Sequence, residues 1–416
     1  MAAPATRIYW DTNADAPVHP RALEAYVRAA RVYSSPDTRH APGREAKALI
    51  DEATTRAARC LGVSAGALHW TSGGTESDAL VSLGVAGGLA QGALIVTSTL
   101  EHPAVVKNLE RLAAERGLRI ERIAAGRDGG VRVEDFVRVL DSHRNQAGPG
   151  AAAFVSCVLV CNETGVVQPI ADLARVCRAR GVLLHTDAAQ APGRIALDLG
   201  ALGADYASLS AHKCGGLAGV GLVYARAGAL GAVQNSLFSV PPALAESFAA
   251  ALEALPDEAE RARLASTRDS FEAALIERLG RATRAKEGTP TSTSTSIGPD
   301  TATGTAAVRQ VGALELVGAT SPRAVNTSCV RFAGIAGEAV VMALDLEGVA
   351  VSAGSACSSG SVEASPVLMG MGMSPAEARE AVRFSLPLGT TRADVERVAQ
   401  ATVEVVQRAV RLGGIA

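Results

Sequence analysis

Residues 182–213, VLLHTDAAQAPGRIALDLGALGADYASLSAHK, contain two short apolar runs that each lead into charged residues. The run 182–185 predicts a buried strand followed by Asp187, and the run 206–210 predicts a second strand followed by Lys213. Neighbouring strands in an open α/β sheet would bring this acid and this lysine to one crevice, where such sheets bind ligands. A lysine held there can form an imine, and the acid can pair with a pyridinium nitrogen. Solvated charges at strand ends are the alternative, and the commoner situation for a single Asp or Lys.

The length and composition of the chain limit the possible classes of protein. Its 416 residues exceed what one hydrophobic core usually holds, so we expect two domains. The chain is 48% hydrophobic and 20% charged, as in soluble globular proteins, and its net charge is −2. Without a long basic tract, we expect no direct nucleic-acid binding and no attraction to an anionic membrane.

The sequence shows no secretory signal and no run of about 18 apolar residues that could span a membrane. We therefore expect a cytoplasmic protein. Seven cysteines are scattered along it: Cys60, Cys157, Cys161, Cys177, Cys214, Cys329 and Cys357. Their odd number favours free thiols over a disulfide framework. Cys157 and Cys161 could suggest a metal site, but they fall in the apolar run 154–161, a predicted strand without a second ligand pair nearby. Buried free thiols are expected there, and no metal site is predicted.

Strands and helices alternate through the first half of the chain. Strands are expected at 7–10, 68–71, 93–97, 118–124, 155–161, 182–185, 206–210 and 219–224. Helices are expected at 21–31, 44–61, 78–89, 105–115, 133–140 and 170–180. This alternation predicts a mostly parallel sheet with right-handed crossovers.

The character of the sequence changes beyond residue 234. Residues 241–281 are expected to be helical, and the Ser/Thr/Gly/Pro-rich segment 287–307 is expected to be a mobile surface loop. The strands expected after it are 326–332, 349–352 and 383–386, and the helices are 337–346 and 392–412. These elements predict a second domain.

A strand, a turn of small residues and a helix start follow one another around residues 72–77, SGGTES. The first N–H groups of a helix lack internal partners, and the helix dipole favours an anion there. Glycines allow close approach, and Ser72 and Thr75 offer hydroxyl groups. The motif can bind a phosphate group, although a tight turn capped by Thr75 would use the same residues.

Seven motifs together resemble those of the cysteine desulfurases, class V members of the fold type I enzymes that use pyridoxal 5′-phosphate. The motifs are TSGGTES (71–77), EHPAVV (101–106), CNETGVVQPI (161–170), HTDAAQ (185–190), SLSAHK (208–213), SAGSACSSGS (352–361) and VRFSLP (382–387). They occur in family order over nearly the whole chain, and the loop around Cys357 resembles that of the NifS/IscS-type branch.

The resemblance implies an α/β fold with two domains. A large domain, 16–262, would contain a mostly parallel seven-stranded sheet and bind pyridoxal 5′-phosphate. Residues 1–15 together with 263–416 would form a smaller α+β domain that carries the catalytic cysteine loop.

The resemblance also implies roles for individual residues. Lys213 would form the imine with the cofactor and remove the substrate's Cα proton, and Asp187 would keep the pyridine nitrogen protonated. Arg383 would bind the substrate carboxylate with its planar fork. The other implied contacts are Gly74, Thr75, Ser210 and His212 around the phosphate, Gln190 at the phenolic oxygen, His102 on the ring face, and Asn162 and Asn13 beside the substrate.

The implied reaction converts L-cysteine to L-alanine in a homodimeric sulfurtransferase. The thiolate of Cys357 would attack the substrate sulfur and keep it as a persulfide for an acceptor protein or small molecule. Two other hypotheses stay open. One is a selenocysteine lyase, or another C–S lyase or transaminase, that uses the same cofactor on a different amino acid. The other is a weakly active sulfur-carrier scaffold.

Three stretches depart from the family pattern. Asp15 and Ala16 stand where the family usually has two threonines near the substrate. Cys214 follows Lys213 where the family has a bulky residue, and we expect a packed side chain there. The segment 229–242 lacks the Gly-Thr signature whose threonine reaches the partner subunit's phosphate. This last difference predicts an altered dimer-side wall, with lower cofactor affinity or a changed substrate.

Overall fold

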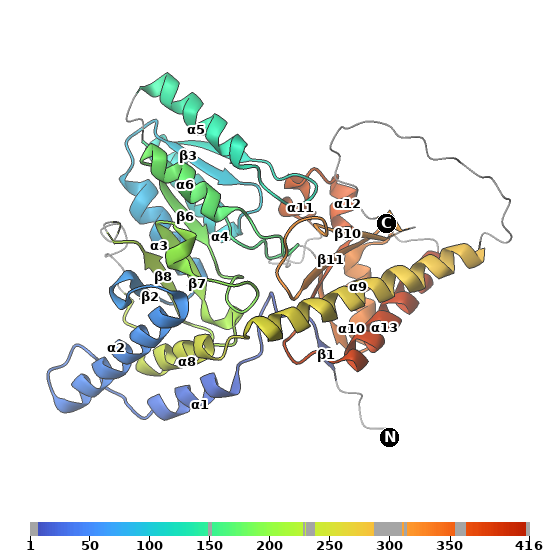
Figure 1. Ribbon diagram of the computed structural model, residues 1–416, viewed down its shortest axis with the longest axis horizontal. Helices are drawn as coiled ribbons and strands as arrows, with labels where there is room; N and C mark the ends of the chain where they lie inside the picture. The colour runs from blue at the N-terminus through green and yellow to red at the C-terminus, as the bar shows by residue number, and fades with distance from the viewer. Residues whose placement is uncertain are drawn as a thin grey trace.

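The computed structural model describes residues 7–148, 152–227, 229, 238–286, 310–311, 314–353 and 363–412 (Figure 1). Its largest sheet has seven strands in the order β2-β8-β7-β6-β5-β3-β4. The strands are β2 (Leu68–Thr71), β3 (Leu94–Ser98), β4 (Arg119–Ile123), β5 (Ala153–Ser156), β6 (Leu183–Asp187), β7 (Tyr206–Ser210) and β8 (Gly221–Ala225). The five strands from β7 to β4 in this order are parallel, and β8 is antiparallel to both of its neighbours. The predicted mostly parallel seven-stranded sheet is confirmed.

Helices cover both faces of this sheet. On β3, Leu94 belongs to one buried apolar cluster together with Phe136 of α5, whereas Ile95 belongs to another together with Val105 of α4. Successive strand residues point to opposite faces, so α4 and α5 lie on opposite sides of the sheet. The α-helices before β8, and the one directly after it, are α1 (Pro20–Ala29), α2 (Ala41–Leu61), α3 (Gly74–Val85), α4 (Pro103–Arg116), α5 (Val133–Ala147), α6 (Ile170–Arg180), α7 (Leu199–Leu202) and α8 (Pro242–Glu253).

A second, antiparallel sheet has the order β13-β14-β11-β10-β9. Its strands are β9 (Gln310–Val311), β10 (Leu314–Val317), β11 (Thr327–Phe332), β13 (Ser352–Ala353) and β14 (Ala381–Ser385). The helices of this part are α9 (Glu258–Lys286), α10 (Gly337–Leu346), α11 (Pro366–Gly370), α12 (Pro375–Arg379) and α13 (Arg392–Arg411). Figure 1 shows α9 as a long helix that leads from the first sheet to the second, with α13 beside it.

The N-terminal segment joins this second part of the structure. β1 (Ile8–Tyr9) pairs in parallel with β12 (Val349–Ala350). Trp10 is buried against Phe271 of α9, with ring centroids 5.0 Å apart, and Phe271 lies 4.8 Å from Phe384 of β14. Large aromatic surfaces of this kind dominate the packing of small cores. The packing of Trp10 anchors the start of residues 11–15, which follow it directly in the chain. The predicted domain boundary at 262/263 lies within α9 and stays a prediction.

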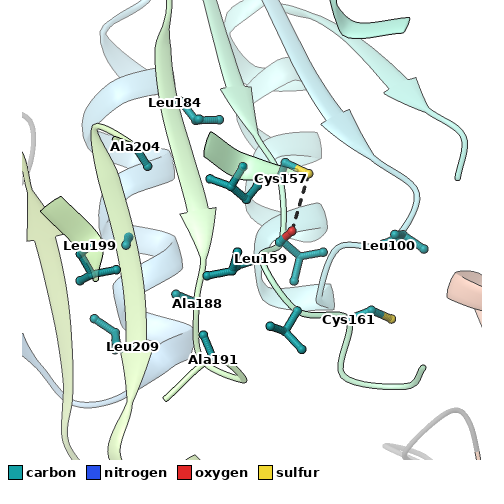
Figure 2. Close-up of a cluster of buried hydrophobic side chains, with 14 of the residues drawn as sticks. Leu100, Cys157, Leu159, Cys161, Leu184, Ala188, Ala191, Leu199, Ala204 and Leu209 are labelled. Atoms are coloured by element: carbon teal, nitrogen blue, oxygen red, sulfur yellow. Dashed lines mark hydrogen bonds between the residues drawn. The ribbon is translucent and has the colours of Figure 1, made fainter. Parts of the chain in front are cut away.

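The predicted strand 155–161 is wrong beyond residue 156. The N–H groups of Cys157 and Leu159 still bond to carbonyls of β6, at His185 and Asp187, but the chain then reverses. The N–H of Cys161 donates to the carbonyl of Val166, 3.0 Å away, which closes a turn. Figure 2 shows Cys157, Leu159 and Cys161 among buried side chains. The apolar run is therefore a buried connection, and both cysteines are free thiols, as expected.

Other differences concern element ends and short strands. Helix α3 begins at Gly74, four residues before its predicted start at Asp78, because its first turn is built from small polar residues without an apolar period. The short strands β9 and β10 were not predicted. The segment 287–307 and the Cys357 loop lie outside the described residues. In the part of the chain that the structure describes, no helix is both long and apolar enough to cross a bilayer.

Candidate active site

The carboxyl ends of β6 and β7 open onto a cavity of about 410 Å³, called here the strand-end cavity. The predicted site residues that fall within the described part of the chain all line it: Asn13, Gly74, Thr75, His102, Asn162, Asp187, Gln190, Ser210, His212, Lys213 and Arg383. Cys357 lies outside the described residues. Segments far apart in the sequence thus supply one concave, mixed polar and apolar site, the usual form of a small-molecule site.

Lys213 lies in a short 3₁₀ turn (Ala211–Lys213) that follows β7. Its Nζ donates to the carbonyl oxygens of Asn13 and Ala14, at 3.0 and 2.5 Å. Burial lowers the pKa of this amine, and the positive charges of Arg194 and Arg383 lower it further, against the opposite effect of nearby carboxylates. An amine with a lowered pKa is more often neutral near pH 7, and it is then a better nucleophile and base.

Asp187 ends β6, whose pairing with β7 places Asp187 opposite Ser208. Its carboxylate is buried and accepts a hydrogen bond of 2.9 Å from the N–H of Ala189. Burial raises the pKa of this carboxyl group, while the Ala189 bond, the protonated form of His102 and the charge of Lys213 oppose the rise. A cationic nitrogen brought into the cavity would favour its ionised form strongly, since little water competes for it.

The start of α3 forms one wall of the strand-end cavity. The N-cap position of this helix is occupied by Gly73, and no side chain forms a cap hydrogen bond there. Thr75 lies inside the helix, so the cap by Thr75 that the sequence left open is not formed. Within the described part of the chain, the N–H groups of residues 74–76 have no protein acceptor, and the nearby N–H of Ser72 bonds to the carboxylate of Glu76 at 2.5 Å. Free N–H groups at a helix start suit an anion.

Glycines let this turn pack closely against the strands. A Cβ on Gly74 would come within 3.2 Å of the Cβ of Ser210, and a Cβ on Gly221 of β8 would come within 2.7 Å of the carbonyl carbon of Gly73. On the other side, the Oγ of Ser210 lies 3.2 Å from the Nδ1 of His212. The helix start and the end of β7 therefore form a compact pocket for a small anionic group.

His102 precedes Pro103, the first residue of α4, and its Nδ1 accepts a hydrogen bond from the N–H of Ala104 at 3.1 Å. Surrounding protein lowers the pKa of His102 by burial, with a further decrease from Lys213 and an opposing effect of Asp187. In the neutral ring the proton then sits on Nε2, because Nδ1 acts as an acceptor. The site thus presents a neutral imidazole with one donor.

Arg383 is 2% exposed on β14. Its Nη2 donates to Asp11 at 2.6 Å and its Nη1 donates to the carbonyl of Asn162 at 3.1 Å, but its buried Nε has no partner within the described structure. A buried unsatisfied N–H is costly, and such a group commonly marks the place of a missing ligand atom. Asp11, which sequence reasoning did not select, orients this guanidinium. In the sequence, the only feature that pointed to Asp11 was its position in the opening loop.

Asn13 is buried, and its side-chain amide is fully engaged by protein groups. Its Nδ2 donates to the carbonyl of Asn162 and to Thr327, and its Oδ1 accepts from Asn326. Its backbone carbonyl also accepts from Gln190, at 2.9 Å. In this geometry Asn13 holds the opening loop against both sheets, and Asn162 contributes its backbone carbonyl to the same network.

Buried titratable groups at and behind the strand-end cavity were also missed by sequence reasoning, and one of them, Asp78, lines the cavity. Asp78 of α3 lies 3.6 Å from the Nε2 of His185, and burial raises the pKa of Asp78 well above its usual value. Burial raises the pKa of Glu101 to about 8 and lowers the pKa of His185 to about 3. With these pKa values, His185 and most of Glu101 are neutral near pH 7, and burial favours the neutral form of Asp78. A signal existed in the sequence: each lies within or beside one of the motifs.

Cys214 does not share the strand-end cavity, although it follows Lys213. It lines a second pocket of about 270 Å³ formed with residues such as His19, Leu255 and Leu386. Its thiol donates to the carbonyl of Ala211 at 3.4 Å, and burial raises the pKa of Cys214 to about 12. Cys214 is thus a packed thiol and not a nucleophile of this site.

The doubly covered sheet, the strand-end cavity and the free helix start define an α/β protein built to hold an anionic small molecule beside a half-buried lysine. The family model described as "Aminotransferase class-V" matches residues 8–398. Cysteine desulfurase IscS of Anaeromyxobacter dehalogenans is 32% identical over 405 residues, which cover 94% of this chain and 90% of that protein. The chain belongs to the class-V aminotransferase family and, within it, to the cysteine desulfurases.

Solved structures share the fold. A structure titled "NIFS-LIKE PROTEIN" has a TM-score of 0.78 and 24% sequence identity, and covers 97% of this chain and 100% of its own. The structure titled "SspA in complex with cysteine" has a TM-score of 0.70 and 23% identity, over 93% of this chain and 100% of its own. At these identities the likeness supports the fold.

Proposed function

We propose that this protein is a pyridoxal-phosphate-dependent cysteine desulfurase that converts L-cysteine to L-alanine and keeps the sulfur as a persulfide on Cys357. The observation that carries the proposal is the arrangement of Lys213, Asp187 and Arg383 around the strand-end cavity, in a chain that belongs to the cysteine desulfurases. The half-buried amine of Lys213 would act as the base, the buried Asp187 would pair with a cationic ring nitrogen, and the guanidinium of Arg383, with its unsatisfied Nε, would bind a carboxylate.

The residues present fit pyridoxal phosphate. The free N–H groups at the start of α3, with Thr75, Ser210 and His212, would hold its phosphate. Asp187 would pair with the ring nitrogen, Gln190 would donate to the phenolic oxygen, and His102 would lie on the ring face. When bound, this cofactor supplies an electron sink that makes the Cα proton of an amino acid acidic.

The chain's own residues carry the remaining steps. Arg383 binds the substrate carboxylate, and the Nζ of Lys213 takes the proton from Cα; burial, which lowers the pKa of this amine, favours the neutral form that can accept a proton. The thiolate of Cys357 then forms an S–S bond with the substrate sulfur as the Cβ–S bond breaks. The electron pair left on Cβ takes up a proton, and Lys213 returns a proton to Cα, so the carbon is reduced as the sulfur of Cys357 is oxidised. The products are alanine and the persulfide.

Wild-type protein loaded with pyridoxal phosphate tests this proposal. With L-cysteine and a thiol reductant, it should release alanine and sulfide in equal amounts, measured by amino-acid chromatography and a sulfide assay. Pyruvate and ammonia in place of alanine would indicate a lyase, and no turnover by cofactor-loaded protein would favour the scaffold hypothesis.

We also infer a homodimer and a cytoplasmic location. The free thiols among the described residues support a reducing compartment. The acceptor of the persulfide sulfur would be a protein or a small molecule. Sedimentation or light scattering of the loaded protein checks the dimer.

An Arg383→Lys variant is expected to raise KM for L-cysteine by about 10- to 100-fold, because a charge-assisted hydrogen bond contributes about 1.5–3 kcal/mol. Lysine keeps the charge but loses the planar fork that Asp11 and Asn162 orient. Steady-state kinetics over a range of cysteine concentrations measures the effect. Arg180→Lys is the matched control, since Arg180 forms a fork with Asp141 outside the strand-end cavity. An unchanged KM in the Arg383 variant would remove this residue from substrate binding.

A further inference from the structure

Arg194 is a buried arginine in the turn after β6, 6% exposed, which the proposed chemistry does not use. Its Nη1 donates to the side-chain oxygen of Gln190 and, at 3.3 Å, to the backbone carbonyl of Gln190. Its Nη2 donates to the backbone carbonyls of Thr12 and Lys213, at 2.8 and 2.9 Å. One guanidinium therefore connects the opening loop, the turn after β6 and the lysine turn after β7.

This guanidinium is buried without a counter-ion. In the part of the chain that the structure describes, no carboxylate forms an ion pair with Arg194, and its acceptors are neutral carbonyl oxygens. Burial lowers the pKa of Arg194 to about 10, which leaves it charged at neutral pH. A buried unpaired charge lowers the stability of the fold unless several hydrogen bonds compensate. The position of the Arg194 guanidinium beside the strand-end cavity therefore suggests a role other than stabilising the fold.

The contact with Gln190 decides how its side-chain amide is oriented. Arginine can only donate, so the amide must turn its Oε1 toward Arg194. The amide nitrogen then points the other way and donates one hydrogen to the carbonyl of Asn13 at 2.9 Å. Gln190 lines the strand-end cavity, and the second hydrogen of its Nε2 is left for a ligand there. A flipped amide would turn its N–H groups toward the donors of Arg194, leave Nη1 with only its 3.3 Å bond to the Gln190 carbonyl, and set two oxygens against each other at Asn13.

We propose that Arg194 is a positioning residue that fixes the amide of Gln190 with its N–H toward the strand-end cavity and ties the Lys213 turn to the opening loop. The inference rests on the proposed function, in which the phenolic oxygen of the cofactor meets Gln190. Arg194 then ensures that this oxygen meets a donor. Its positive charge also lowers the pKa of Lys213, in the same direction as burial.

The test compares the visible absorbance spectrum of bound pyridoxal phosphate among variants. Arg194→Met keeps the length and apolar stem but removes every donor. The absorbance maximum of the bound cofactor is expected to shift from that of wild type. The kcat is expected to fall about tenfold, with a smaller change in KM, which is the effect of losing the one hydrogen bond that orients the Gln190 amide. In a Gln190→Ala background the same substitution should add a clearly smaller shift, because only the contact of Arg194 with the Lys213 turn is then lost.

Arg178→Met is the matched control. Arg178 also donates to a carbonyl, that of Gly203 at 2.9 Å, but lies on the surface away from the strand-end cavity, so its variant should keep the wild-type spectrum. Arg194→Lys is expected to show a smaller shift in the same direction, since one ammonium cannot reproduce the planar fork. If circular dichroism shows that Arg194→Met does not fold, the lysine variant decides the question by the same comparison.

The inference is overturned if the folded Arg194→Met variant, or Arg194→Lys in its place, keeps the wild-type absorbance spectrum. It is also overturned if the substitution shifts the absorbance maximum equally with Gln190 present and with Gln190 replaced by alanine. These spectra require only that the cofactor binds. If wild-type protein binds pyridoxal phosphate but releases no alanine, the proposed reaction fails, while the spectra still decide the role of Arg194.

Discussion

A Lys213→Ala variant is expected to form alanine from L-cysteine about 10³-fold more slowly than wild type, the size of effect typical of a general base. The Nζ of Lys213 donates to the opening-loop carbonyls of Asn13 and Ala14, and Lys213 lines the strand-end cavity together with the buried Asp187. Methyl in its place leaves no amine there to take the Cα proton or to bond covalently to the cofactor. Alanine chromatography measures the rate, and the visible absorbance of bound cofactor reports the covalent attachment.

The matched control for this prediction is Lys47→Ala. Lys47 forms an exposed ion pair with Asp51 on α2, which contributes little to stability, so its loss should change neither rate nor spectrum. A Lys213→Ala protein that keeps a tenth or more of the wild-type rate would show that another group moves the proton, and the assignment of this lysine would then be wrong.

A Cys357→Ala variant is expected to lose alanine formation to a similar extent, but for a different reason and with a different signature. Without the thiolate, no nucleophile receives the substrate sulfur. The cofactor spectrum should stay as in wild type, and the variant should still exchange the Cα proton of L-cysteine with solvent deuterium, because Lys213 is intact. Nuclear magnetic resonance of the recovered cysteine measures this exchange.

Cys214→Ala tests the thiol that stands next to Lys213 in the sequence. The thiol of Cys214 bonds to a backbone carbonyl in the second pocket and has a raised pKa, so this variant should desulfurate cysteine at close to the wild-type rate. Turnover that survives Cys357→Ala, with pyruvate or alanine as product, would favour a lyase or transaminase in place of a desulfurase. Turnover that is lost with Cys214→Ala would move the nucleophile to that position.

Local patterns in the sequence predicted much of the sheet and its helices. The helix Ile170–Arg180 and the strand Tyr206–Ser210 coincide with their predicted ranges, because each has a clear period and a turn signal at both ends. The run 155–161 misled the prediction, since a continuous apolar segment looks the same in a buried strand and in a buried connection. Only the turn closed by Cys161 and Val166 distinguishes them.

Motif resemblance predicted which residues would surround the strand-end cavity, but it could not supply their partners. The bond of Arg383 to Asp11 and those of Arg194 to Thr12, Gln190 and Lys213 mostly join residues distant in sequence. No periodicity signals such contacts, because they arise when the N-terminal segment pairs with β12 and brings the opening loop over the large sheet. The buried state of Asn13 follows from the same event.

Persulfide formation on Cys357 can be tested directly by the mass of the peptide that contains this residue. The mass is measured after cofactor-loaded wild-type protein reacts once with L-cysteine in the absence of reductant. We predict that this peptide gains the mass of one sulfur atom, removable by a thiol reductant, while an equal amount of alanine is released. Alanine release with Cys357 unmodified, or the added sulfur on another cysteine, would contradict it.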